Sequence, residues 1–167
     1  MIPGRRYVTI TALKETTTPV MKTSMESLLN LKTKFSPKTD GTIIVLNDFP
    51  MQKSGPQNAD CCAFNQVPWY NYQIPADWGE NPSLDSEMET WADTLLEKVI
   101  EIEVGNTKSE DTLAGRWGYY NAGSGKTDAS VVFDGNYRRL RKLKRKFDPE
   151  NVFNKWYPIE PAVELSN

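Results

Sequence analysis

Short stretches in which apolar and polar positions alternate are spread along the chain, and this period of two is typical of β-strands. The clearest is residues 6–13, which alternate and are rich in β-branched and aromatic types. Further strands are predicted over residues 42–49, residues 61–74 and residues 113–121, and Pro68 interrupts the second of these. The two faces of the first strand are predicted to be Tyr7, Thr9 and Thr11 against Val8, Ile10 and Ala12.

Helical spacing of apolar residues marks a different kind of segment. Residues 19–35 have Thr18 as a predicted N-cap, a proline in the first turn, and Ser36-Pro37 at their end. Residues 84–103 have the strongest amphipathic pattern in the sequence. The apolar faces are Met21, Met25, Leu28, Leu29 and Phe35 in the first helix, and Met88, Trp91, Ala92, Leu95, Leu96, Val99 and Ile100 in the second.

A third helical pattern, over residues 137–147, is both amphipathic and strongly basic. Asp148-Pro149 ends it, because proline disfavours helical geometry in the residue before it. Its apolar members are Tyr137, Leu140, Leu143 and Phe147, and its cations are Arg138, Arg139, Arg141, Lys142, Lys144, Arg145 and Lys146. A nucleic-acid site is the competing interpretation, but one basic helix in a chain of net charge -2 favours a solvated or chain-pairing face. We therefore expect no nucleic-acid partner.

The predicted elements follow the order strand, helix, strand, strand, helix, strand and a final helix. This is the order of the ferredoxin-like split βαβ fold, so the predicted class is α+β: an antiparallel four-stranded sheet, two helices on one face, and an extra C-terminal basic helix. At 167 residues a single domain is expected, with sheet and helices in residues 1–121 and a linker, helix and tail in residues 122–167. The other sheet face is left uncovered, and an aromatic face there must be buried against a ligand, a second copy of the chain or the C-terminal segment.

Composition excludes several kinds of chemistry. Hydrophobic residues at 38% and charged residues at 25% describe a soluble globular protein, and no apolar run approaches the ~20 residues of a membrane span. The N-terminus has no apolar signal region, so a cytoplasmic protein is expected. There is no histidine, which excludes a Ser-His-Asp or Cys-His relay, and two adjacent cysteines, Cys61 and Cys62, are too few for a zinc site. No metal site is predicted.

Aromatic residues make up 11% of the chain, and several fall on predicted strands beside hydroxyl and amide groups. Tyrosine and asparagine can orient a carbonyl by hydrogen bonding, and an arginine can pair with a carboxylate. The predicted catalytic residues are Arg116, Tyr119, Tyr120 and Asn121, and the predicted substrate-binding residues are Tyr7, Thr9, Trp69, Tyr70, Tyr72 and Trp117. Alternation sends neighbours to opposite faces, so about half of the set is expected to fill the core or a subunit contact.

Three motifs toward the C-terminus form a set. They are Tyr119-Tyr120-Asn121, then Asn136-Tyr137-Arg138-Arg139-Leu140 with Lys144, then Phe147-Asp148-Pro149-Glu150-Asn151-Val152-Phe153. They resemble the Y-x-N strand motif, the N-Y-x-R-L core with its lysine, and the Y/F-D-P-x-N-x-F closing signature of berberine bridge enzyme-like FAD-linked oxidases. The resemblance is specific over residues 116–159 and concerns only the layout over residues 1–66. Phe133-Asp134-Gly135 departs from the family, which usually has Tyr-Gly before the core.

The resemblance implies that the chain is most of a substrate domain, the sheet that roofs the flavin and contacts the substrate. The family's FAD-binding domain and its flavin-tethering histidine have no counterpart in these 167 residues. The leading hypothesis is a cofactor-free enzyme of specialised metabolism that cyclises or isomerises an apolar, carbonyl-bearing small molecule by orientation and electrostatics, a pericyclic step included. The alternatives are a partial oxidase that acts with a separate FAD-binding chain, and a non-catalytic dimeric binding module. A homodimer is the expected assembly.

Overall fold

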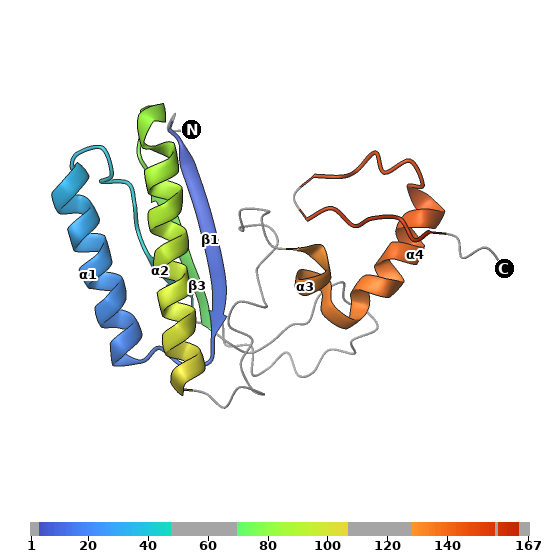
Figure 1. Ribbon diagram of the computed structural model, residues 1–167, viewed down its shortest axis with the longest axis horizontal. Helices are drawn as coiled ribbons and strands as arrows, with labels where there is room; N and C mark the ends of the chain where they lie inside the picture. Colours follow the sequence, from blue (N-terminus) through green and yellow to red (C-terminus); the bar gives the residue numbers. More distant parts are fainter. Residues whose placement is uncertain (1–3, 48–69, 107–127, 156, 164–167) are drawn as a thin grey trace. The chain divides into compact units, whose positions relative to one another are not determined.

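The computed structural model describes residues 4–47, 70–106, 128–155 and 157–163 (Figure 1). The chain divides into two compact units. The described residues of the first unit are 4–47 and 70–106, and those of the second are 128–155 and 157–163. Each unit has a hydrophobic core of its own.

The first unit is built on an antiparallel sheet whose strands lie in the order β1-β3-β2. These strands are β1 at Arg6–Leu13, β2 at Val45–Asn47 and β3 at Tyr70–Asp77. β1 and β3 pair along their whole length, from Arg6 opposite Asp77 to Leu13 opposite Tyr70. This order and these directions are those of three strands of the predicted ferredoxin-like sheet, so the α+β class is confirmed. The fourth predicted strand, residues 113–121, lies outside the described residues.

Two predicted strands differ in their bounds from the strands observed. β2 begins only at Val45, and ahead of it the Thr42 side chain forms hydrogen bonds with the backbone of β3. Its Oγ1 donates to the Asp77 carbonyl at 2.8 Å and accepts from the Asp77 N–H at 3.0 Å. β3 extends through Pro75 to Asp77, beyond the predicted end at residue 74, since proline adopts an extended conformation and its carbonyl accepts from the Ile43 N–H at 3.2 Å. The earlier part of that predicted strand, residues 61–69, lies outside the described residues.

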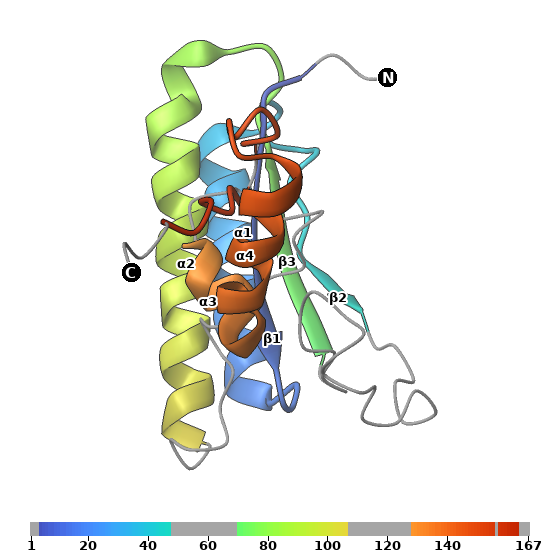
Figure 2. The same cartoon turned by 90° about the vertical axis from the view of Figure 1, so that its right-hand side faces the viewer.

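Two helices cover one face of this sheet, and Figures 1 and 2 show them on the same side of the strands. They are α1 at Thr18–Phe35 and α2 at Asp85–Asn106, and the short 3-10 helix η2 at Pro82–Leu84 leads into α2. Both predicted helices are confirmed with small shifts: Thr17 rather than Thr18 is the N-cap of α1, and α2 extends three residues beyond its predicted end at residue 103.

The buried face of α1 is displaced by about one residue from the apolar face predicted from the sequence, although Phe35 of the predicted face does pack against the core. Val20, Ser24 and Leu31 are buried, whereas Met21, Met25 and Leu29 are 40%, 51% and 58% exposed. Both sets are spaced at the helical period, so spacing alone does not separate them. The polar Ser24 is buried because its hydroxyl bonds to Tyr72 of the sheet, and this contact fixes the rotation of α1.

The second unit consists of α3 at Ala129–Phe133, the 3-10 helix η3 at Asp134–Asn136, and α4 at Tyr137–Phe147. α4 confirms the predicted basic helix. α3 lies where the sequence analysis placed a linker, and the Asp128 side chain caps it by accepting from the Ser130 N–H at 2.7 Å. The small core of this unit contains Ala129, Val132, Phe133 and Tyr157, with Tyr137, Leu140 and Ile159 packed against it.

Candidate functional site

Three of the predicted substrate-binding residues, Tyr7, Thr9 and Tyr72, lie on the sheet face that α1 and α2 cover. They are 8%, 6% and 0% exposed. The strand register explains their common position, because Thr9 is paired with Ile74 and Tyr72 with Thr11, and paired residues of antiparallel strands share a face. These side chains therefore belong to the core between sheet and helices, and they do not lie on the uncovered face for which they were predicted.

Hydrogen bonds from this core reach both helices. The Tyr7 hydroxyl donates to Asp93 of α2 at 2.7 Å, and the Tyr72 hydroxyl lies 2.7 Å from the Ser24 hydroxyl of α1. Burial raises the pKa of Tyr72 to about 12, and the hydrogen bond with Ser24 opposes that shift only in part. At neutral pH Tyr72 is therefore a neutral structural donor rather than a general base.

The opposite face of the described strands is aliphatic and amide-bearing rather than aromatic. Val8 and Ile10 of β1 lie there beside Gln73 and Pro75 of β3 and Val45 of β2, and all five are partly exposed. At one end of this face the Arg6 guanidinium pairs with the Asp77 carboxylate at 2.9 Å. At the other end Ala12 and Asn71 are buried, and the Asn71 Oδ1 has no hydrogen-bond partner among the described residues.

The remaining predicted site residues are only partly described. Tyr70 is partly buried and packs against the core of the first unit. The others lie outside the described residues: Trp69, Arg116, Trp117, Tyr119, Tyr120 and Asn121. The predicted catalytic set therefore stays a prediction.

The closing signature of the C-terminal segment folds into a compact turn at the end of α4. The Lys144 ammonium donates both to the Asp148 carboxylate and to the Phe153 carbonyl. The same carboxylate accepts from the backbone N–H groups of Val152 at 2.8 Å and Phe153 at 3.0 Å. The hydrogen bond from Lys144, followed by those from the backbone, holds the pKa of Asp148 below its ordinary value.

The residue types of this signature follow from the geometry of the turn. Asn151 has a φ of 53°, in the left-handed region that asparagine tolerates better than most residues. The side chains of Lys144 and Asp148 are each only 12% exposed, so the ion pair is largely shielded from solvent. The lysine, aspartate and asparagine thus serve the fold of the segment.

Large apolar side chains on the same turn face outward. Phe147, Val152 and Phe153 are 73%, 67% and 82% exposed. Clustered exposed apolar side chains of this size are typical of a surface that contacts another part of a protein. They do not belong to the core formed by the described residues of the second unit, which consists of α3, the start of α4 and the segment around Tyr157.

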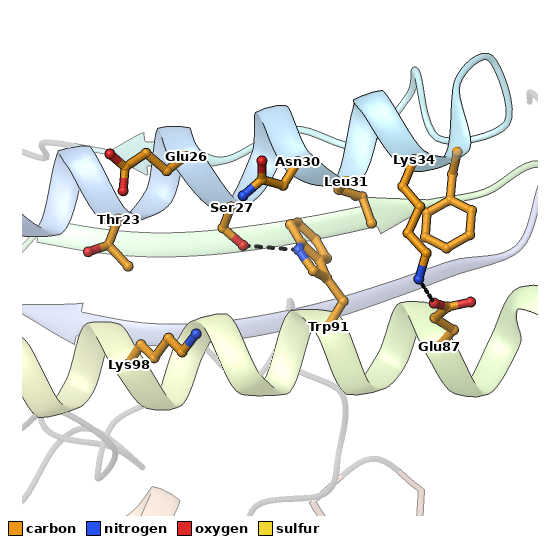
Figure 3. A pocket seen from close by; sticks show the side chains of 10 residues that line it. Thr23, Glu26, Ser27, Asn30, Leu31, Lys34, Glu87, Trp91 and Lys98 are labelled. Carbon is orange, nitrogen blue, oxygen red and sulfur yellow. Dashed lines mark hydrogen bonds and ion pairs between the residues drawn. The ribbon is translucent and has the colours of Figure 1, made fainter.

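A hollow between α1 and α2 is lined by residues that were not predicted to bind a ligand (Figure 3). Its volume is about 350 Å³, within the range of small-molecule sites. A sequence signal was present, because Thr23, Ser27 and Asn30 form a polar stripe at helical spacing on α1 beside the buried stripe.

Within the described part of the chain, no group of three or more Cys, Asp and Glu side chains is arranged to hold a metal ion. None of the helices in those ranges combines the length and apolar character needed to cross a bilayer.

Comparisons with known proteins relate this architecture to flavin-linked oxidases. The family described as "Berberine and berberine like" matches residues 119–160. FAD-linked oxidoreductase pgmH of Aspergillus terreus is 34% identical over 95 residues, which is 54% of this chain and 19% of that protein. Among solved structures, berberine bridge enzyme from Eschscholzia californica matches with a TM-score of 0.65 at 18% identity, covering 95% of this chain and 33% of the enzyme. Carbohydrate oxidase from Microdochium nivale gives 0.65 at 18%, covering 96% and 33%.

The fold is thus that of one third of an FAD-linked oxidase. The chain carries the C-terminal motif of the berberine and berberine-like family, which confirms the resemblance seen in the sequence. It spans about a fifth of the length of the curated relatives it matches.

The fold family implies FAD, and the described part of the open sheet face does not fit the pyrophosphate of this cofactor. The pyrophosphate of the cofactor needs cations or a cluster of backbone N–H groups. On the open face of the three described strands the cation is Arg6, and Asp77 already neutralises it. The described part of this face can cover a flat apolar ring with Val8, Ile10 and Pro75.

Proposed function

We propose that this chain supplies the substrate-facing sheet and the closing segment of an FAD-linked oxidoreductase of secondary metabolism. A separate part of the protein, or a separate chain, holds the flavin. The observation that carries the proposal is the closing signature, which is fully formed and yet presents Phe147, Val152 and Phe153 to solvent. A surface of this kind needs a partner, and the match to one third of the length of such oxidases supports a flavin-binding partner.

In this arrangement the open face of the sheet lies over the reacting centre. Its aliphatic side chains at Val8, Ile10 and Pro75 exclude water, and the Gln73 amide can donate to or accept from a polar group of the substrate. The flavin, when bound, supplies the oxidation itself.

The test is co-expression with a separate flavin-binding polypeptide or, where this chain is part of a longer protein, purification of that whole protein. We expect a yellow complex containing the chain, and Phe153→Ser and Phe147→Ser should weaken it. Leu29→Ser is the matched control, since Leu29 is also exposed and apolar but lies on α1 of the first unit. A complex that survives both phenylalanine changes unaltered would contradict the proposed docking surface.

A second candidate is cofactor-free cyclisation or isomerisation of an apolar, carbonyl-bearing substrate by Arg116, Tyr119, Tyr120 and Asn121. The start of the family match at residue 119 favours a role for this motif. The chain purified alone and free of flavin absorption should then convert such a substrate, and Tyr119→Phe and Tyr120→Phe should slow it. If the chain alone instead forms a stable homodimer without ligand response, light scattering and titration will favour the non-catalytic dimeric module.

A further inference from the structure

The hollow between α1 and α2 has an apolar wall, and side chains of both positive and negative charge lie around it. Figure 3 shows the helices on its two sides, with Trp91 standing between them. Its lining residues are Thr23, Glu26, Ser27, Asn30, Leu31, Lys34 and Phe35 from α1, and Glu87, Trp91 and Lys98 from α2.

Most of the charged groups around the hollow are already paired. At one end the Lys34 ammonium contacts the Glu87 carboxylate at 2.5 Å. Glu26 pairs with Lys22 at 3.9 Å, and its carboxylate points away from Trp91 in Figure 3. Lys98 has no ion-pair or hydrogen-bond partner among the described residues, so it is the cation left over for a ligand.

The indole of Trp91 is held in a fixed orientation. Its Nε1–H donates to the Ser27 hydroxyl at 3.0 Å, so the one hydrogen-bond donor of the ring is occupied. What Trp91 offers a ligand is therefore a flat apolar surface, continued by Leu31 and Phe35 of α1.

The spacing along α2 brings this surface and the cation together. Trp91 and Lys98 are seven residues apart, about two helical turns or roughly 10 Å along the axis. Helical side chains lean toward the N-terminus of their helix, and in Figure 3 the Lys98 ammonium points along the hollow toward Trp91. A ligand with a bicyclic ring and one anionic group is long enough to contact Trp91 with its ring and Lys98 with its anion, because the lysine side chain covers part of the distance between the two residues.

We propose that the α1–α2 hollow is a binding site for a small, flat aromatic carboxylate. Its ring packs against Trp91 and Leu31, its carboxylate pairs with Lys98, and the exposed amide of Asn30 is free among the described residues to donate a further hydrogen bond. The site lies on the helix side of the first unit, away from the open sheet face, and does not rest on the proposed function.

The test uses naphthoate as the probe and follows the indole N–H signals of the purified chain by NMR during titration. Trp91→Phe identifies the Trp91 signal by its disappearance. We expect that signal to move saturably with one-to-one stoichiometry. Lys98→Met should weaken binding by about two- to fivefold, which corresponds to a partly solvated ion pair. Lys98 is exposed, so this variant should remain folded, as circular dichroism will show.

Two controls make the outcome decisive. Lys142→Met removes an exposed lysine of the second unit and should leave naphthoate binding unchanged. Naphthylmethylamine has a similar ring and the opposite charge and should bind more weakly than naphthoate. The proposal is overturned if the Trp91 signal does not saturate, if Lys98→Met has no effect, or if the amine binds as tightly as the acid.

Discussion

The hydroxyls of Tyr72 on β3 and Ser24 on α1 lie 2.7 Å apart in the core of the first unit. The Ser24 hydroxyl donates its single proton to the Val20 carbonyl at 2.7 Å, so Tyr72 must be the donor in the bond that the two hydroxyls share. This bond joins the central strand to α1. The fully buried tyrosine of that strand thus lies under the helices, on the face opposite to Val8 and Gln73.

Replacing Tyr72 by phenylalanine should lower the free energy of unfolding by about 1 kcal/mol. The ring still fills its place, so the cost is that of the lost hydrogen bond, and Ser24 keeps its bond to Val20. Urea denaturation followed by circular dichroism will measure the change. Tyr70→Phe is the matched control on the same strand, because Tyr70 is only partly buried, and it should change stability by less than about 0.5 kcal/mol. Equal effects for the two changes would contradict the assigned role of the Tyr72 hydroxyl.

The stability of the first unit should fall at alkaline pH. The pKa of Tyr72 is about 12 in the folded chain against 10.0 for an unperturbed tyrosine, because burial disfavours the phenolate. Between these values the folded state binds more protons than the unfolded state, so the free energy of unfolding decreases as the pH rises from 10 toward 12 and is unaffected by this group below pH 10. The loss by pH 12 should be about 2 to 3 kcal/mol. The Tyr72→Phe variant should show a smaller alkaline loss, and an unchanged slope in that variant would refute the assignment.

Two leucines on α1 should respond very differently to truncation. Leu31 is 4% exposed and packs in the core, whereas Leu29 is 58% exposed. Leu31→Ala should cost about 2 to 5 kcal/mol through lost burial and a residual cavity, and Leu29→Ala should stay within about 0.5 kcal/mol. Denaturant titration of both variants tests which face of α1 enters the core. A larger loss for Leu29 would restore the apolar face predicted from the sequence.

Asp148→Asn should open the turn that follows α4. Asparagine keeps the size of the side chain but removes the charge that Lys144 and the N–H groups of Val152 and Phe153 bind. Amide exchange at Val152 and Phe153 should become several-fold faster, while that of α2 in the first unit stays unchanged. Acid should act in the same direction in the unaltered chain: the pKa of Asp148 is lowered by folding, so its contribution is present above its ordinary pKa of 3.8 and is lost as the pH falls below that value.

Comparison of sequence and structure shows where pattern analysis succeeds. β1 and α4 have the bounds that their periodicity predicted, and the order of the three described strands agrees with the split βαβ order. The closing signature was recognised from its residue types, because Asp148 and Asn151 each serve a local turn geometry that few other residues satisfy.

Periodicity does not separate two alternative faces of a helix or strand where both faces have the same period. The stripe through Met21 and the stripe through Val20 both have the helical period. In the same way, the alternation along β1 and β3 predicts that their tyrosines share a face with every second residue, but it does not predict which face of the sheet the helices cover. α3 was missed because five residues are too few for a helical period to be visible, and its Asp128 cap was the one local signal.

The sequence alone determined the order and kind of the elements and the family signature at the C-terminus, because periodicity and turn chemistry act over a few neighbouring residues. Only the tertiary structure decided which face of each element is buried, since that depends on partners distant in the chain. Ser24 faces the core through its bond to Tyr72, and the strand register places Tyr7, Thr9 and Tyr72 together on the covered face, which leaves aliphatic and amide groups on the open face.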